Sequence, residues 1–404
     1  MTPDIKHIAR NLAHRSVLRP PHIRYCSQTI YETLLGCCRM WEATHDALWE
    51  FRAGNVLSIL LHIQQPDGGF DIGYDFNFGR LHRKGQSTSP ELVGLVALCE
   101  YARLFGEEQV RPAAVKAVEW IRKHALDMGE RKFAIPYSPI TINEVMVYNG
   151  TSFACGALGC YLGQFGGDEE LHDIYNGMVQ YMEFVLSKNE NLPGCFWYYC
   201  DQLRDDLDEM QKSKIDYYHQ MQQVEMHALA HQVSPLNIQL RIIGEAADHI
   251  VALHERHPII PYTNNPKLFK NQIHLWGLSS VVSGLLEAAV MMPDRSELYR
   301  KVASDILDWV VSYAWNGYHF EAILTNDGSH VDTRLYMVRS DAWVFNALAA
   351  AAKHLGSDQW RDITEKCYQK MESVDYSGPE SHASSLRSQI AITIWSFFKR
   401  MVGK

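Results

Sequence analysis

Several features that would place a protein outside the cytoplasm or on a nucleic acid are missing from this sequence. None of its nine cysteines forms a C-x-x-C pair, and most, such as Cys99, Cys155 and Cys160, lie in apolar helical stretches. This pattern predicts reduced, buried thiols in a cytoplasmic protein. No basic stripe offsets the formal charge of −9, which argues against a nucleic-acid partner. No apolar run has the length of a signal-peptide core or a membrane span, so we expect no membrane partner.

The common signatures of nucleophilic and metal-dependent enzymes are also missing. There is no G-x-S-x-G sequence and no P-loop. Asp67, Asp71 and Asp75 are four residues apart, but no Gly or Glu completes a calcium loop. His227 and His231 lack the glutamate of H-E-x-x-H, which favours packing histidines over a zinc pair. We therefore expect no metal and no other cofactor.

The sequence does contain a repeat of about sixty residues. Each repeat opens with a helical pattern rich in small residues, such as TSFACGALGCYLGQFG, followed by a more amphipathic one, such as SELYRKVASDILDWVVSYA. Small residues let neighbouring helices pack closely, and a charged face is suited to solvent. The opening patterns begin near Gln28, Pro90, Thr151, Tyr218, His274 and Asp341.

Six such hairpins predict an all-α fold, an (α/α)6 toroid with inner and outer helices. We expect one domain over residues 1–404, with short strands only in loops such as FWYY and GYHFEAIL. An open solenoid would need shorter and more regular repeats. The loops before the inner helices are instead long and aromatic, as in QQPDGGFDIGYDFNFGRLHRKGQSTS, and loops of that length are usually functional.

Parallel inner helices should bring their first residues together at one end of the ring. The residues placed there are Ser87, Ser89, Glu91, Asn149, Thr151, Tyr217, Tyr218, His219, Gln222, His274, Trp276, Arg339, Asp341 and Trp343. Aromatic residues in the nearby loops provide flat faces on which a sugar ring stacks. We expect at least two of them to line a cleft: Phe70, Tyr74, Trp197, Tyr198 and Trp276.

Asn, Tyr, His and Arg at one site suit the removal of the C5 proton of a uronic acid. Asn149 and Arg339 would hold the carboxylate beside that carbon. Tyr218 and His219 would remove and return the proton, with Tyr217 and His274 as further catalytic candidates. Return of the proton to the opposite face gives an epimer, and loss of the C4 oxygen gives β-elimination. The other substrate-binding candidates are Asp341, Trp197, Trp276, Tyr74 and Glu91.

The segment KIDYYHQMQQVEMHAL resembles the W-D-Y-H-x-x-H stretch in the C-terminal domain of the glucuronyl C5-epimerases. That resemblance implies a catalytic tyrosine, at Tyr217 or Tyr218, in a carbohydrate-active toroid enzyme. QQPDGGF is likewise similar to the Gln-x-x-x-Gly-Gly-aromatic segments of that domain. The chain departs from the family in its extra tyrosine and in lacking the large N-terminal β-region.

The alternatives are a glycoside hydrolase, a terpenoid cyclase or prenyltransferase, and a non-catalytic scaffold. A hydrolase would need two opposed carboxyl groups, for which Asp216, Asp341, Glu91 and Glu225 are available. A cyclase or prenyltransferase would need an acidic motif, but DQLRDDLDE has the composition of a solvated turn. A scaffold would not need so many polar groups at one end of the ring. We expect a sugar or oligosaccharide as the partner, and the chain could form oligomers.

Overall fold

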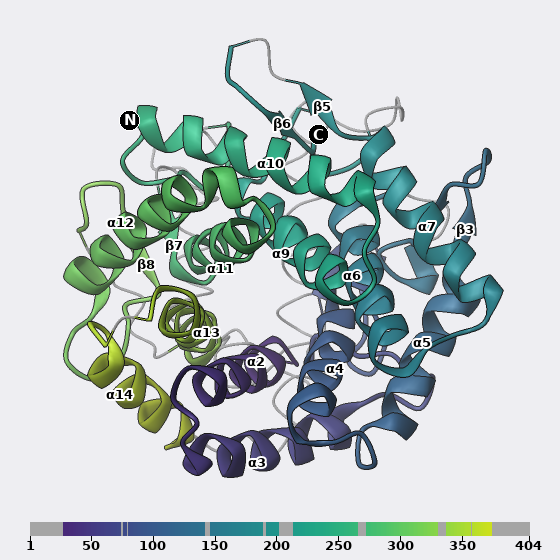
Figure 1. Ribbon diagram of the computed structural model, residues 1–404, viewed down its shortest axis with the longest axis horizontal. Helices are drawn as coiled ribbons and strands as arrows, with labels where there is room; N and C mark the ends of the chain where they lie inside the picture. Colours follow the sequence, from purple (N-terminus) through teal and green to yellow (C-terminus); the bar gives the residue numbers. More distant parts are fainter. Residues whose placement is uncertain are drawn as a thin grey trace, which may run out of the picture.

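The computed structural model describes residues 27–73, 76–78, 80–141, 146–188, 191–201, 213–265, 272–329, 337–356 and 358–373. Within these ranges the helices form two concentric rings (Figure 1). The inner ring consists of α2 (Ser27–Thr44), α4 (Val93–Phe105), α6 (Tyr148–Phe165), α9 (Tyr217–Val233), α11 (Leu275–Met291) and α13 (Val338–Leu355). The outer ring consists of α3 (Ala47–Ile63), α5 (Arg111–His124), α7 (Glu169–Phe184), α10 (Asn237–Arg256), α12 (Ser296–Ala314) and α14 (Arg361–Glu372).

The inner ring is closed. Each inner helix packs against the next along the chain, and α13 packs against α2 (Figure 1). The predicted (α/α)6 toroid is therefore confirmed, and an open solenoid is excluded. The starting points predicted from the repeat lie within about one turn of the observed starts of the inner helices.

Small residues on the inner helices allow this close packing. Every residue of α6 from Tyr148 to Leu162 is buried. A β-carbon on Gly156 would stand 2.7 Å from that of Met226 on α9. On α11, a β-carbon on Gly284 would overlap the backbone oxygen of Met221. The inner helices thus approach one another more closely than larger side chains would permit.

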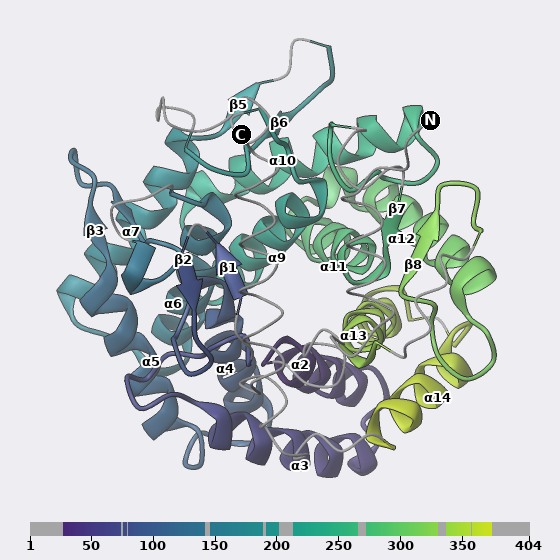
Figure 2. The same ribbon diagram turned by 180° about the vertical axis from the view of Figure 1, so that it is seen from behind.

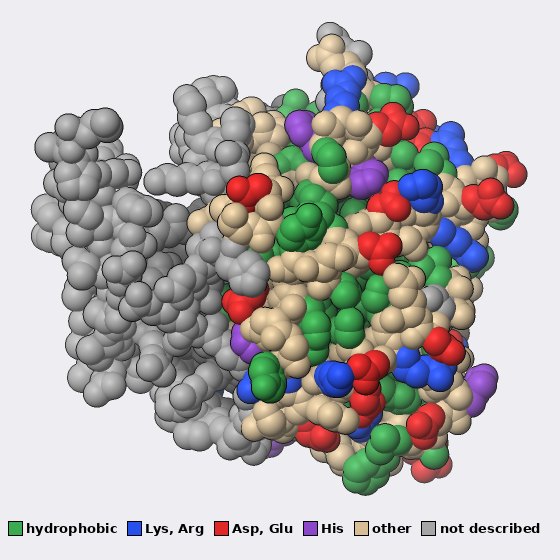
Figure 3. All heavy atoms as spheres, turned by 90° about the vertical axis from the view of Figure 1, so that its left-hand side faces the viewer, with side chains coloured by type: hydrophobic (Ala, Val, Ile, Leu, Met, Phe, Trp, Pro, Cys, Tyr) green, Lys and Arg blue, Asp and Glu red, His purple; other side chains and the backbone are tan. Residues whose placement is uncertain are grey.

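The outer helices are amphipathic, as the sequence predicts. In α5, for example, Ala113, Ala117, Trp120 and Ile121 are buried, whereas the remaining face is polar. On the side of the molecule that carries α12 and α14, acidic and basic side chains are interspersed (Figure 3). None of the helices in the described ranges combines the length and the apolar content that a membrane span requires. The cysteines of these ranges are buried, and none of them forms a disulfide bond.

The connections at the two ends of the ring differ in length. From an inner to an outer helix the chain turns within a few residues, and α4, α6 and α13 end at glycines with positive φ, namely Gly106, Gly166 and Gly356. The connections from outer to inner helices are longer and contain η2 (Ser89–Leu92), η3 (Pro139–Thr141) and the short strands. A further short helix, η5 (Pro293–Arg295), lies between α11 and α12.

The strands pair in antiparallel ladders, some near the start of the inner helices and others against the outer helices α7 and α10. Figure 2 shows β1–β2 and β7–β8 over this end of the ring, which we call the mouth. The β7–β8 ladder pairs Gln272 with Thr325 and His274 with Ile323, which fixes the chain directly before α11. The described ladders are β1 (Phe76–Phe78) with β2 (Arg80–His82), β3 (Leu126–Asp127) with β4 (Phe133–Ala134), β5 (Ser187–Lys188) with β6 (Cys195–Phe196), and β7 (Gln272–His274) with β8 (Ile323–Thr325).

Candidate active site

A carboxylate and an imidazole are held together at the start of α9. Asp216 is the N-cap residue, and its Oδ1 accepts the backbone N–H of His219 at 3.1 Å. Its Oδ2 lies 2.7 Å from Nδ1 of His219 and 3.0 Å from Nζ of Lys214. The contact with Nδ1 is short enough for an ion pair, although the ring N–H does not point squarely at the oxygen. One carboxylate thus caps the helix and positions the histidine.

The charge of Asp216 is stabilised although the side chain is buried. Burial by itself acts to raise the pKa of Asp216. The charges of His219 and Lys214 and the backbone hydrogen bond from His219 outweigh burial and hold this pKa well below its usual range. Asp216 is therefore ionised at neutral pH.

The other nitrogen of His219 is accessible. The side chain of His219 is 18 % exposed. Its Nε2 points away from Asp216 and has no hydrogen-bond partner among the described residues. A histidine anchored through Nδ1 with Nε2 open has the arrangement of a proton donor or acceptor.

Aromatic rings surround this histidine. The ring of Trp276, which is half-buried, lies 5.8 Å from His219, 5.9 Å from Tyr262 and 6.2 Å from Trp343, measured between centroids. The guanidinium carbon of Arg339 lies 5.0 Å from the centre of the Trp276 ring. The mouth thus places a partly exposed indole beside His219 and a cation against that indole.

A tyrosine from the preceding loop also lies next to the histidine. The ring of Tyr199 is 5.7 Å from that of His219, and Nζ of Lys214 lies 3.9 Å from the Tyr199 ring centre. Tyr199 is half-buried, and its hydroxyl has no hydrogen-bond partner among the described residues. Burial raises the pKa of Tyr199, and the charge of Asp216 adds to the effect, so the phenol stays protonated.

A second buried carboxyl group lies in η2. Glu91 accepts a hydrogen bond from Nε2 of Gln28 at 3.0 Å and a short one from the hydroxyl of Ser27. Burial raises the pKa of Glu91, against the effect of these hydrogen bonds. The carboxyl group of Glu91 therefore holds its proton more tightly than that of Asp216.

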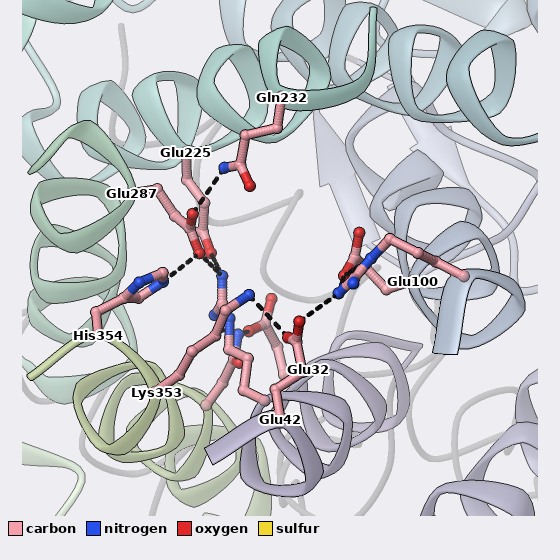
Figure 4. A network of polar contacts seen from close by, with 11 residues as sticks. Glu32, Glu42, Glu100, Glu225, Gln232, Glu287, Lys353 and His354 are labelled. Atoms are coloured by element: carbon pink, nitrogen blue, oxygen red, sulfur yellow. Dashed lines mark hydrogen bonds and ion pairs between the residues drawn. The ribbon is translucent and has the colours of Figure 1, made fainter. Parts of the chain in front are cut away.

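Farther along the ring axis, charged residues from several inner helices form one network around Arg39 (Figure 4). Nη2 of Arg39 lies 2.7 Å from Glu225 and 3.0 Å from Glu287, and its Nη1 donates to Asn346 at 2.7 Å. Asn346 in turn donates to Glu32 at 2.6 Å. We call these five residues the Arg39 cluster. All five are at most 4 % exposed, so the axis is filled at this depth.

Charge within the Arg39 cluster is unevenly distributed. Burial raises the pKa of Glu32 well above its usual range, and the charge of Glu225 adds to the effect. Burial acts in the same direction on Glu287, but His354, Arg39 and Lys353 outweigh it, so that its pKa is well below normal. Glu287 also accepts a hydrogen bond from Gln232 at 3.0 Å. The cluster thus combines Glu287, whose pKa is lowered, with Glu32, whose pKa is raised.

Of the residues predicted from the sequence, His219, Trp276, Arg339 and His274 lie together at the mouth. His274 immediately precedes α11, and its half-buried ring is 5.5 Å from that of Tyr262. Asn149 begins α6 and is 4 % exposed. Tyr74 and most of the acidic segment DQLRDDLDE lie outside the described residues.

Other predicted residues have structural contacts instead. Tyr218 is fully buried, and its hydroxyl donates to the carbonyl of Ile260 at 3.1 Å. Trp197 is 1 % exposed and donates its indole N–H to the carbonyl of Met182 at 2.9 Å. Neither side chain presents its polar group at the mouth, because a backbone oxygen already binds it.

Tyr217 and Asp341 are buried as well. The ring of Tyr217 packs 6.1 Å from that of His249, and burial raises the pKa of Tyr217 to about 12. Oδ1 of Asp341 accepts the backbone N–H of Phe320 at 3.1 Å. Phe70 is 1 % exposed, whereas Tyr198 is half-buried against Phe196.

The structure adds residues that the sequence did not single out. Lys214 could have been identified from the sequence as a partner of Asp216, because residues two apart in an extended segment share a face. Tyr199 and Tyr262 come from loops whose path no periodicity determines. No group of His, Cys, Asp and Glu side chains suited to a metal ion occurs within the described ranges.

Comparison with known proteins gives similarity in structure only. No family model matches the chain, and no curated protein sequence matches it. A cellobiose 2-epimerase from Spirochaeta thermophila is similar, with a TM-score of 0.60 and 10% identity over 92% of this chain and 98% of that one. A sugar epimerase from a ruminal bacterium gives a TM-score of 0.59 and 12% identity, covering 82% of this chain and 88% of the other.

A glycoside hydrolase of family 105 from C. acetobutylicum gives a TM-score of 0.58 and 14% identity, covering 87% of this chain and 99% of the other. At such low identity these likenesses establish the fold alone. The chain has the (α/α)6 toroid fold that carbohydrate epimerases and glycoside hydrolases also use.

Proposed function

We propose that this protein is a carbohydrate-active enzyme that transfers a proton at a carbon atom of a uronic acid, by C5 epimerisation or β-elimination. The observation that carries the proposal is the pair of Asp216 and His219, whose imidazole lies beside Trp276, the indole that Arg339 also contacts. The sugar epimerases of the same fold support the substrate class, and the resemblance of KIDYYHQ to the glucuronyl C5-epimerases supports the uronic acid.

In this mechanism the C5–H bond breaks and its proton moves to Nε2 of His219. The electron pair passes into the carboxylate as an enolate, whose charge Arg339 stabilises. Asp216 stabilises the imidazolium that forms. Tyr199, a protonated phenol next to His219, donates its own proton to C5 in epimerisation or to the departing C4 oxygen in elimination. The proton held by His219 then passes through solvent to the Tyr199 phenolate, which restores both groups. Tyr199 thus takes the role that the sequence assigned to Tyr218.

The test is product analysis with uronic-acid oligosaccharides. We expect the wild type to form an epimer or an unsaturated product, and His219→Asn to lower turnover by about 10²- to 10⁴-fold. His254, which lies 3.9 Å from Asp305 on the outer ring, is the matched control. His254→Asn should keep wild-type turnover. Wild-type turnover by His219→Asn would refute the proposal.

A glycoside hydrolase is the second candidate, favoured by the two unlike carboxyl groups. Burial raises the pKa of Glu91, the direction that a general acid requires, and Asp216 is ionised. A hydrolase would release new reducing ends without an unsaturated product. It would lose this activity in Glu91→Gln, whereas a proton-transfer enzyme would depend on His219.

A further inference from the structure

Three glutamines on α9 have different environments. Gln220 donates Nε2 to the carbonyl of Ala246 on α10 at 2.9 Å, although its oxygen has no partner. Gln223 accepts a hydrogen bond from Ser152 on α6 at 3.0 Å. Gln222 is 5 % exposed, and its amide makes no hydrogen bond with any described residue. Only Gln222 of the three is therefore buried without a structural partner.

Helical spacing places Gln222 on the axis side of α9. Glu225, three residues further on, reaches Arg39 across the ring, and residues three apart share a helix face. The same argument applies to α13, where Trp343 precedes Asn346 of the Arg39 cluster by three residues. Gln222 and Trp343 thus lie one turn nearer the mouth than the Arg39 cluster. Nε1 of Trp343 is buried and also lacks a partner.

A third such group comes from α6. Asn149 is 4 % exposed, and its amide has no hydrogen bond with the described residues. The hydrogen bond from Ser152 to Gln223 fixes the register of α6 and α9, which run parallel. Asn149 therefore lies within about one turn of Gln222 along the axis.

Buried polar groups in proteins are nearly always hydrogen-bonded, so three exceptions at one level require an explanation. Two carboxamides and an indole N–H offer donors and acceptors without charge. That set matches sugar hydroxyls, which both donate and accept, better than a phosphate or a carboxylate, which only accepts when ionised. The Arg39 cluster fills the axis directly below, so a sugar chain does not pass through the ring there.

We propose that Asn149, Gln222 and Trp343 form a subsite for the hydroxyl-bearing edge of one terminal sugar ring. The Arg39 cluster is the floor of this subsite. The inference rests on the proposed function and deepens it: the carboxylate edge of the reacting ring faces Arg339, and the neutral edge points down the axis. The substrate is then a chain end or a short oligosaccharide rather than the interior of a polymer.

The test compares Gln222→Met with Gln220→Met, two equal changes on one helix. Binding of methyl β-D-glucuronide and methyl β-D-glucoside is measured by saturation-transfer NMR and calorimetry, together with the melting temperature. We expect Gln222→Met to weaken binding of both probes by about 3- to 10-fold, the loss of one or two neutral hydrogen bonds. Its melting temperature should equal or exceed that of the wild type. Gln220→Met should melt lower and keep the wild-type Kd.

Turnover separates this subsite from the proposed function. In Gln222→Met we expect a higher KM with little change in kcat, and in His219→Asn the reverse. If the wild type binds both probes but turns over no uronic substrate, the proposed function fails and the subsite stands. If Gln222→Met melts lower than the wild type and binds both probes normally, Gln222 is structural and the subsite is refuted. Absence of wild-type binding to either probe would also refute it.

Discussion

At the scale of single residues, Asp216 joins a helix cap to an ionic anchor. Its two oxygens bind the first turn of α9, the ring of His219 and the ammonium of Lys214. Replacement by Asn keeps the capping oxygen and removes the charge. We therefore expect Asp216→Asn to lower both turnover and stability, the latter by about 1–3 kcal/mol at pH 7.

The stability loss in Asp216→Asn should depend on pH. Because the folded-state pKa of Asp216 is depressed, its contribution is fully present above the unfolded value of about 3.9 and is lost as the pH falls toward the folded value. Urea unfolding should be measured from pH 7 to about pH 3. We expect the difference in free energy of unfolding between the wild type and the variant to shrink below about pH 4. A constant difference would mean that the Asp216 charge does not stabilise the fold.

Tyr218 and Tyr199 offer a second comparison at this scale. The hydroxyl of Tyr218 binds the carbonyl of Ile260, whereas that of Tyr199 has no partner among the described residues. We expect Tyr218→Phe to lose about 1 kcal/mol of stability and keep its activity. Tyr199→Phe should keep its stability and lose turnover. Unfolding curves and rates for the two variants check this, and the opposite pattern would return the catalytic role to Tyr218.

At the scale of helices, glycines set the distance between inner neighbours. A β-carbon on Gly284 of α11 would overlap the backbone oxygen of Met221 on α9, which cannot rotate away. Gly284→Ala should therefore destabilise by about 1–3 kcal/mol. Gly54 of α3 is the control, because its nearest neighbour would be 3.8 Å away. Gly54→Ala should stabilise by about 0.5–1 kcal/mol, since alanine favours the helix. Equal changes in stability for Gly284→Ala and Gly54→Ala, measured by thermal unfolding, would contradict the close packing of α9 and α11.

The Arg39 cluster links α2 to α9, α11 and α13. Removal of its cation would leave the carboxylates of Glu225 and Glu287 buried without their partner. We expect Arg39→Met to destabilise by about 3–5 kcal/mol. Arg103 pairs with Glu42 and Glu100, but its side chain is 35 % exposed. Arg103→Met should therefore cost less than about 1 kcal/mol. Denaturant unfolding measures the free energy of unfolding of both variants. An equal loss in the two would mean that burial of the ion pairs of Arg39 does not add to their contribution.

At the scale of the whole molecule, the repeat in the sequence was sufficient to predict the ring. In each repeat, small residues marked the first helix as inner and charged residues marked the second as outer, and both assignments were correct. The common mouth followed because the inner helices run parallel. His219, Trp276, Arg339 and His274 could be placed there because they begin inner helices.

Other parts of the site could not be predicted. Tyr218 and Asp341 also begin inner helices, but the direction of their side chains depends on loop carbonyls and amides that the spacing does not specify. Tyr199 comes from a loop. The partners of Arg39 are 186 and 248 residues away in sequence, at Glu225 and Glu287, so only the closed ring brings them together.

The most direct test of proton transfer by His219 is the uptake of solvent deuterium. Uronic oligosaccharides would be incubated with the protein in D2O, and carbon-bound deuterium would be located by NMR. We predict that the wild type and His254→Asn either incorporate deuterium at C5, as epimerisation requires, or release a product unsaturated between C4 and C5, as elimination requires, and that His219→Asn does neither above background. Conversion of a sugar substrate without any carbon-bound deuterium, at an equal rate in His219→Asn, would contradict the account.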